Sequence, residues 1–212
     1  MIETKFNRII DDWKVVKNHC RTTVNKKFSE KDASDSFKKK LLIAEHSPIR
    51  LIEFDWSWEN MPYWVSTELS RHKHEKFISS QRNDRQSNYD RNEARQDASV
   101  KMDNYANMQQ LIDISKKRLC HAATDEARSY MENFKYELAK THPIEASVLV
   151  PTCIYSLGCR EMSCCGLIGK FLNYAKEKGY KMEDLVNIQT RYDIYNEFFK
   201  ENYENTGVKE EN

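Results

Sequence analysis

The sequence predicts an α+β fold: a small mixed or antiparallel sheet packed against several helices, in a single domain spanning residues 1–212. Apolar and polar residues alternate over Ile52–Trp58, which is the pattern of a half-buried strand. Apolar residues recur at helical spacing over 167–175 and again over 185–199. A length of 212 residues bounds the chain to one compact domain or two small ones.

The N-terminal part is predicted to contain two helices. Apolar residues recur at helical spacing from Phe6 to Val16 on a charged background, so we expect an amphipathic helix there. Polar residues 29–36 interrupt this pattern, and Ser34 or Asp35 can cap a second helix. The second helix should end before Pro48, because the residue preceding a proline avoids the helical conformation.

A strand and a short helix come next. One face of Ile52–Trp58 is apolar and the other polar, so one face must be covered by other elements. Pro62 fits the first turn of a helix that runs to Ser70. Beyond it, Phe77-Ile78 predicts a short second strand.

The second half is predicted to be mainly helical. Segment 86–97 is almost wholly polar and predicts a loop or an exposed helix, whereas 102–140 predicts a long helical region. The apolar run 143–151 fits either a strand or a buried turn. Gly179 separates the two C-terminal helices, and the last ten residues are typical of a frayed tail.

Composition excludes several classes of function. A net charge of +1 produces no overall field that would gather nucleic acid, so we expect no nucleic-acid partner. The absence of a long apolar run and the charged N-terminus predict a soluble, cytoplasmic protein with no membrane partner. All five glycines lie at or after Gly158, so the earlier part cannot hold a glycine-built phosphate loop. Any nucleotide must therefore be held by side chains and helix ends.

The six cysteines are expected to be thiols, because disulfides are rare in cytoplasmic proteins. Cys159, Cys164 and Cys165 form a cluster that invites a metal interpretation. Their spacing differs from the CxxC pairs of zinc sites, and no histidine lies close to them in the sequence. We therefore expect buried or site-lining thiols and no metal.

The residues that can carry chemistry follow the third predicted helix. Arg71-His72-Lys73 comes directly after it, and Ser79-Ser80-Gln81-Arg82 follows the short strand. Paired arginines, hydroxyls and an amide are the donors needed to grip a phosphate and read a base edge without a glycine loop. Interleaved acidic residues leave open the alternative of a salt-bridged surface.

The order of these residues resembles that of the flavin-dependent thymidylate synthases. Arg71-His72-Lys73 with Ser80-Gln81-Arg82 is similar to the family's RHR triplet and its Ser-x-Arg element, after one deletion. Cys20-Arg21-Thr22-Thr23 stands where the family carries an Ala-Arg-x-Ser/Thr element, and Glu45-His46 precedes the aromatic strand in the family's order. Pro143-Ile144-Glu145-Ala146 resembles the family's PxEAR segment. The resemblance covers roughly residues 20 to 155.

Several positions depart from the family's pattern. Lys73 replaces the second arginine of the triplet by a flexible ammonium, and Lys76 replaces a serine. Ser147 stands where the family usually has an arginine that helps hold the nucleotide. The family's late Arg…Ala-Gln segment is absent, although Arg160 can supply a replacement charge. The chain thus resembles a divergent branch of the kind found in bacteriophage genomes, which implies the cytoplasm of a bacterial or phage-infected cell.

The resemblance implies a homotetramer whose sites lie where subunits meet. FAD, dUMP and methylenetetrahydrofolate come together there, and NADPH reduces the flavin. The folate supplies one carbon to C5 of dUMP, the flavin supplies the hydride that completes the methyl group, and the protein supplies orientation and charge.

The same resemblance implies roles for individual residues. Ser80 and Arg82 are the implied catalytic residues, since Ser80 would polarise the pyrimidine and Arg82 would grip the nucleotide. The implied substrate-binding residues are Arg71, Ser79, Ser80, Gln81, Arg82 and Arg160. The implied cofactor-binding residues are His46, Arg71, His72 and Lys73.

Other interpretations remain open for these residues. His46 can be a turn residue before Pro48, and His72 can be a buried imidazole with satisfied hydrogen bonds. The product can be a 5-hydroxymethyl pyrimidine nucleotide, if water instead of hydride quenches the intermediate. Lys73 and Ser147 favour a further alternative, a catalytically idle nucleotide-binding or structural homologue.

Overall fold

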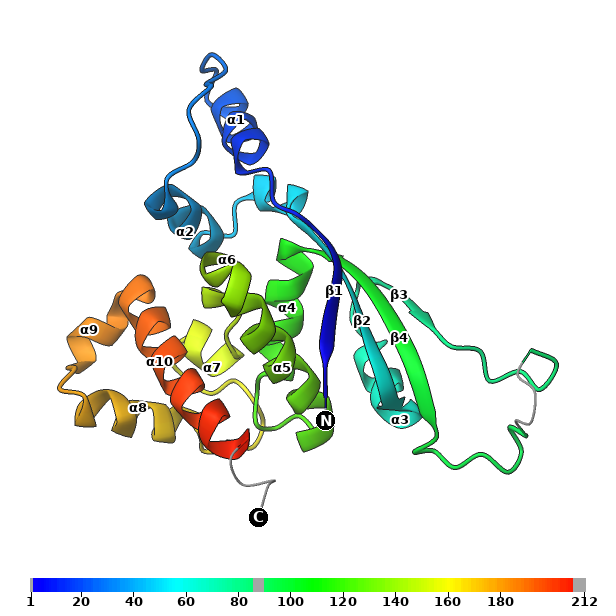
Figure 1. Ribbon diagram of the computed structural model, residues 1–212. Helices are drawn as coiled ribbons and strands as arrows, with labels where there is room; N and C mark the ends of the chain where they lie inside the picture. The colour runs from blue at the N-terminus through cyan, green and yellow to red at the C-terminus, as the bar shows by residue number, and fades with distance from the viewer. Residues whose placement is uncertain (1, 86–89, 208–212) are drawn as a thin grey trace.

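The computed structural model describes residues 2–85 and 90–207, and of 205–207 only the backbone (Figure 1). The strands are β1 (Thr4–Ile10), β2 (Glu53–Pro62), β3 (Glu75–Ile78) and β4 (Ser99–Asn107). The longer helices are α1 (Trp13–Thr23), α2 (Asp35–Ile43), α3 (Tyr63–Leu69), α4 (Met108–Arg118), α5 (Asp125–Thr141), α8 (Leu167–Glu177) and α10 (Ile188–Gly207). Short helices are α6 (Pro143–Ser147), α7 (Thr152–Tyr155), α9 (Met182–Val186) and the 3-10 helix η1 (Ser47–Leu51).

The four strands form one antiparallel sheet in the order β1-β2-β4-β3. Trp56 and Trp58 of β2 are almost fully buried, and their rings meet the Phe134 ring of α5 edge-on, with centroids 4.8 and 6.5 Å apart. Figure 1 shows α4 to α10 gathered on one side of the sheet, with α1 and α2 beyond the end where β2 begins. The prediction of an α+β fold is confirmed, and the sheet is antiparallel.

The prediction of a helix from Phe6 to Val16 is wrong in its first half, which is strand β1. The β1–β2 register shifts between Phe6 and Arg8, so that Phe6 pairs with Trp56 but Ile9 pairs with Phe54. This bulge places the extra residue Asn7 between two inward-facing apolar residues, which are then three positions apart instead of two. A bulged strand therefore has the apolar spacing of a helix. Helix α1 begins only at Trp13, after the cap formed by the Asp12 side chain.

The predicted long helix over 102–140 is also wrong in its first part, because residues 99–107 form β4. This strand pairs with both β2 and β3 and is one of the two inner strands of the sheet. Its inward residues Met102, Asn104 and Ala106 are no more than 1% exposed. Met, Asn and Ala are not residues that favour strands, so the neighbouring strands override local preference. Helix α4 starts after β4 with a capping box between Asn107 and Gln110.

Three elements of the first half agree with the sequence prediction. Helix α2 begins after Ser34, whose side chain accepts a hydrogen bond from the Phe37 amide. The aromatic strand is present as β2, which extends to Pro62, and Pro62 itself is the N-cap of α3. The short strand at Phe77-Ile78 is present as β3.

The apolar run 143–151 is not a strand. Its first half forms the short helix α6, and Val148, Leu149 and Val150 follow in a fully buried turn. Buried Glu145 accepts a hydrogen bond of 2.6 Å from the Trp13 indole, which links α6 to α1. Of the two predicted alternatives, the strand is wrong and the buried turn is confirmed for residues 148–150, after the short helix α6.

The C-terminal helices are present with changed boundaries. Gly166 and Gly179 flank α8 in the left-handed conformation, with φ of 85° and 87°. The helix predicted over 185–199 is split at Asn187 into α9 and α10. Residues 203–207 of the predicted frayed tail belong to α10, and residues 208–212 lie outside the described residues.

The polar segment 86–97 is a loop where the structure describes it, over 90–97, and residues 86–89 lie outside the described residues. No helix in the described ranges is long and apolar enough to cross a membrane.

Candidate functional site

The turn that carries Arg71-His72-Lys73 is held between two buried residues. Helix α3 ends at Leu69, which is 2% exposed, and the amides of Arg71 and His72 donate back to carbonyls of its last turn. After the turn, His74 is 7% exposed and its Nε2 lies 3.0 Å from Oδ1 of Asn104 on β4. These two buried residues therefore fix the position of the triplet at the protein surface.

The imidazole of His72 is engaged by an arginine that lies far away in the sequence. Nε of Arg118, at the end of α4, donates to Nε2 of His72 over 2.7 Å. Because Nε2 accepts, the proton of the neutral ring is on Nδ1. Burial, and then the charge of Arg118, lower the pKa of His72 from 6.5 to about 4. His72 is therefore a neutral hydrogen-bond donor at neutral pH.

Glu68 holds Arg118 in place. Its carboxylate accepts from the Arg118 guanidinium over 3.1 Å and from the Thr124 hydroxyl over 3.0 Å, while its backbone carbonyl accepts a second guanidinium hydrogen bond over 2.8 Å. The three residues Glu68, His72 and Arg118 thus form one network that joins α3, the turn and α4. Its strongest contacts involve charged groups.

Arg71 and Lys73 flank His72 in the turn. Both are exposed, and neither has an ion-pair partner among the described residues. Two unpaired cations flanking a neutral histidine donor make the turn suited to an anion such as a phosphate.

A cavity of about 230 Å³ opens beside the turn. Its walls come from His72, from Lys117 and Arg118 of α4, and from the segments around Cys120 and Glu161. Lys117 and Glu161 form an ion pair of 2.9 Å. Arg160 is exposed and adjacent in sequence to Glu161, which lines the same cavity as His72.

The second half of the predicted nucleotide grip lies at the other end of β3. Ser79 continues the strand pairing with Lys101, with backbone and side-chain hydrogen bonds of 2.9 and 3.1 Å. Four residues of strand separate the two halves, a span of about 13 Å. Arg71-His72-Lys73 and Ser79-Ser80-Gln81-Arg82 therefore lie at opposite ends of β3.

Arg82 is engaged by its own loop. Its guanidinium makes two hydrogen bonds to the Asp84 carboxylate, of 2.9 and 2.6 Å, and both side chains are more than half exposed. This pair lowers the pKa of Asp84. The Ser80 hydroxyl accepts from the Arg82 amide over 3.3 Å, and Gln81 is half-buried. To pair with the Arg82 guanidinium in the same way, an anionic ligand would have to displace the Asp84 carboxylate.

His46 belongs to neither the turn nor the loop. It is exposed at the start of η1, and its side chain makes no capping hydrogen bond. Its neighbour Glu45 accepts from Lys116 over 2.8 Å and from Gln109 over 2.6 Å, both on α4. The same helix therefore contacts the segment of His46 and, through Arg118, the turn of His72.

The other segments of the resemblance make internal contacts. Arg21 donates to the Lys27 carbonyl over 2.6 Å, and Thr22 and Thr23 donate to carbonyls within α1. Ser147 donates to the Ile144 carbonyl over 2.7 Å. These contacts leave Arg21 and Ser147 with structural roles within the chain.

All six cysteines are free thiols. Burial raises the pKa of Cys120 and brings that of Cys153 to about 12. Both thiols are therefore protonated at neutral pH and are poor nucleophiles. Within the described ranges, no group of three or more metal-binding side chains is placed to hold a metal ion.

Sequence reasoning missed Arg118, Glu68, Lys117 and Glu161. None of them belongs to a motif, and Arg118 is 46 positions from His72. The only sequence signal was the run Lys116-Lys117-Arg118 at the end of a helix, which is equally typical of an ordinary basic C-terminus.

No family model and no curated protein sequence matches the chain. Solved structures, however, are similar in fold to this chain. One is the flavin-dependent thymidylate synthase ThyX from Helicobacter pylori complexed with FAD and dUMP, with a TM-score of 0.58 and 12% identity over 70% of this chain and 99% of that chain. Another is a UMP/dUMP methylase, PolB from Streptomyces cacaoi bound with 5-Br dUMP, with a TM-score of 0.56 and 12% identity over 70% of this chain and 94% of that chain.

The chain therefore has the fold of the flavin-dependent thymidylate synthases, as its motif order predicted. At 12% identity the likeness establishes the fold and leaves the chemistry to be argued from the residues.

Proposed function

We propose that this protein transfers a one-carbon unit to C5 of dUMP, with FAD, NADPH and methylenetetrahydrofolate. The observation that carries the proposal is the turn Arg71-His72-Lys73, which presents two unpaired cations and a neutral histidine donor beside a cavity. The neighbours in fold, crystallised with FAD and dUMP or with 5-Br dUMP, support the same class of nucleotide substrate.

The chemistry of the turn fits a flavin nucleotide. Arg71 and Lys73 would hold its phosphates, and Nδ1 of His72 would donate a hydrogen bond. His46, at the start of η1, would contact the flavin from outside the turn. When bound, the flavin supplies the hydride that the protein itself lacks. Arg118 and Glu68 keep His72 neutral and fixed in orientation, so that the ring donates and does not compete for a proton.

The substrate half of the site consists of Ser79, Ser80, Gln81 and Arg82, with Arg71 and Arg160 as further cations. Ser80 polarises the pyrimidine, and Arg82 exchanges Asp84 for the nucleotide phosphate. Because β3 separates this half from the turn by about 13 Å, a complete site combines the turn of one subunit with the loop of another. We propose a homotetramer, as the resemblance implies, for the assembly in which every turn meets a loop.

A second function is favoured by the contacts of Arg82 and His72. Arg82 makes two hydrogen bonds to Asp84, and Nε2 of His72 is occupied by Arg118. A protein that binds a pyrimidine nucleotide without turning over a flavin would tolerate both contacts. Lys73, in place of an arginine fork, is consistent with this catalytically idle alternative.

The absorbance spectrum of the purified protein separates the two functions. A bound oxidised flavin gives bands at about 375 and about 450 nm whatever the protein. Release of tritium from dUMP labelled at C5, in the presence of NADPH and methylenetetrahydrofolate, then tests transfer to that carbon. Flavin bands together with tritium release support the enzyme. Nucleotide binding without flavin, after the protein is supplied with FAD, would establish the idle alternative.

A further inference from the structure

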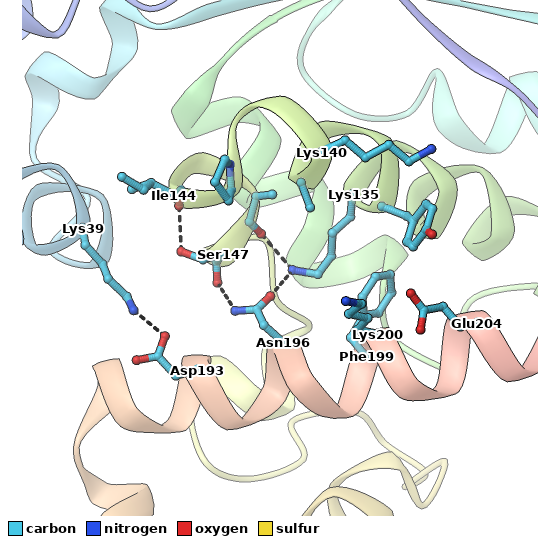
Figure 2. A pocket seen from close by; sticks show the side chains of 14 residues that line it. Lys39, Lys135, Lys140, Ile144, Ser147, Asp193, Asn196, Phe199, Lys200 and Glu204 are labelled. Atoms are coloured by element: carbon cyan, nitrogen blue, oxygen red, sulfur yellow. Dashed lines mark hydrogen bonds and ion pairs between the residues drawn. The ribbon is translucent and has the colours of Figure 1, made fainter. Parts of the chain in front are cut away.

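A second and larger cavity, of about 550 Å³, lies on the helical side of the molecule. Helices α5, α6 and α10 surround it, and Lys39 of α2 lies at its edge (Figure 2). None of the residues implied for the nucleotide or the flavin lines it. Ser147, which stands where the family usually has a nucleotide-binding arginine, does line it, so the cavity is distinct from the turn and the loop of the proposed function but adjoins one segment of the resemblance.

Lys135 of α5 reaches this cavity although it is 2% exposed. Its Nζ donates to the Ala146 carbonyl over 2.8 Å and to Oδ1 of Asn196 over 2.6 Å, as Figure 2 shows. An ammonium has three N–H donors, so one remains after these two hydrogen bonds. The rings of Phe199 and Tyr195 lie 5.1 and 5.7 Å from Nζ. Every partner of Lys135 in the described part of the chain is neutral.

The other charges around the cavity do not compensate Lys135. Lys39 is paired with Asp193, and Lys140 with Glu137 over 2.7 Å. Lys200 and Glu204, from α10, are exposed at the rim. A buried ammonium without a counter-ion is unfavourable, because neutral dipoles replace only part of its hydration. Burial accordingly lowers the pKa of Lys135 to about 7.

The walls of the cavity are mainly apolar. Tyr136, Pro143, Ile144 and Phe199 form them, together with the methyl groups of two alanines. Apolar walls with a single buried donor at the base are typical of sites for small organic molecules. A ligand that fits this cavity therefore has two parts. Its anionic group is the counter-ion for Lys135, and its apolar body packs against the walls.

We propose that this cavity binds a small organic carboxylate, whose anionic group pairs with Lys135 and whose apolar body lies between Phe199 and Ile144. The carboxylate accepts the third N–H of Lys135 and supplies the counter-ion that the chain does not. Inorganic phosphate and dUMP lack an apolar body of this kind and are poor ligands for the cavity.

Titration calorimetry with 3-phenylpropionate tests the proposal, with 3-phenylpropanol as the uncharged probe of the same shape. We expect the carboxylate to bind at least about tenfold more tightly than the alcohol. Lys135→Met should remove this preference, and Phe199→Ala should weaken both probes. Lys26→Met, which changes an exposed lysine far from the cavity in the sequence, is the matched control and should leave both affinities unchanged.

Proton uptake is a second readout that a merely structural lysine would not produce. An anion raises the pKa of Lys135, so binding at about pH 8 should take up a fraction of a proton, and binding at about pH 6 almost none. Tyr136, Asp193, Lys39, Lys140, Lys200 and Glu204 also face the cavity, and Lys135→Met separates their uptake from that of Lys135. Calorimetry in buffers of different ionisation enthalpy measures the uptake in the wild-type protein. This measurement therefore remains possible even if Lys135→Met does not fold.

Three results would overturn the proposal. One is equal affinity for 3-phenylpropionate and 3-phenylpropanol, or no binding of either at millimolar concentration. Another is proton uptake at about pH 8 that persists in folded Lys135→Met. The third is displacement of 3-phenylpropionate by dUMP, which would assign the cavity to the nucleotide.

Discussion

At the scale of single residues, the protonation state of His72 is set by contacts that bridge α3 and α4. Its pKa in the folded protein is about 4, against 6.5 for an ordinary histidine. Between these two values the unfolded chain binds a proton that the folded chain does not. The contribution of His72 to stability is therefore present above about pH 6.5 and is lost as the pH falls toward about 4.

We predict that Arg118→Met raises the pKa of His72 toward 6.5. The substitution removes a like charge and the hydrogen bond that directs Nε2, and it admits water to the cavity beside the ring. NMR titration of the histidine rings measures the shift. Lys117→Met, on the same helix but without contact to His72, is the control. A wild-type His72 that titrates near its ordinary value would contradict the burial described for the ring.

Arg82 and Asp84 define the second residue-scale prediction. If Arg82 grips the nucleotide phosphate, Arg82→Ala should weaken dUMP binding by about 2–4 kcal/mol, roughly thirty- to a thousandfold. Asp84→Asn should instead strengthen it, because the competing carboxylate becomes neutral. Exposed Arg91→Ala should change affinity by less than about threefold. Titration calorimetry on the three variants decides, and equal small losses for Arg82→Ala and Arg91→Ala would mean that the loop is ordinary surface.

At the scale of elements, β4 determines the sheet and carries a buried polar contact at its centre. Asn104 is 1% exposed and bonds to His74, whose other ring nitrogen, Nδ1, is buried without a hydrogen-bond partner among the described residues. The contact fixes β4 to the segment between the Arg71-His72-Lys73 turn and β3. The position of the turn thus depends on the central strand.

We predict that Asn104→Ala lowers the free energy of unfolding by about 1–3 kcal/mol, since both nitrogens of His74 would then be buried without partners. Lys101→Ala, at a half-exposed position of the same strand, should change it by less than about 0.5 kcal/mol. Urea denaturation followed by circular dichroism compares the two variants. A loss for Asn104→Ala no larger than that for Lys101→Ala would show that the His74 contact is not a strong anchor.

At the scale of the whole molecule, the two halves of the candidate site lie at opposite ends of β3. Under the proposed function, a symmetric assembly joins each turn to a loop of another subunit. The same reasoning makes catalysis dependent on assembly and so on protein concentration.

We predict a homotetramer in solution at micromolar concentration. Light scattering coupled to size-exclusion chromatography measures the mass directly. The control is the same measurement with added dUMP and FAD, which should leave the mass unchanged if the assembly exists before the ligands bind. A monomeric mass under both conditions would refute the shared site and leave only the turn as a ligand site.

Much of the fold was predictable from local patterns because those patterns have local causes. Ser34 caps α2 through its own side chain, Pro62 starts α3 through its fixed φ, and the alternation of Phe54, Trp56 and Trp58 reports a strand with one buried face. The motif order around Arg71-His72-Lys73 likewise predicted the fold that the solved structures share.

The rest was decided only by tertiary structure. Strand β1 has helical spacing because a bulge opposite β2 offsets Ile9, and β4 consists of residues without strand preference that two neighbouring strands hold in place. The partners of the candidate residues, Arg118 for His72 and Asn196 for Lys135, come from positions 46 and 61 residues away. Such contacts exist only after the helices have packed, because packing alone brings distant side chains within hydrogen-bond distance and removes the water that would otherwise set their charge.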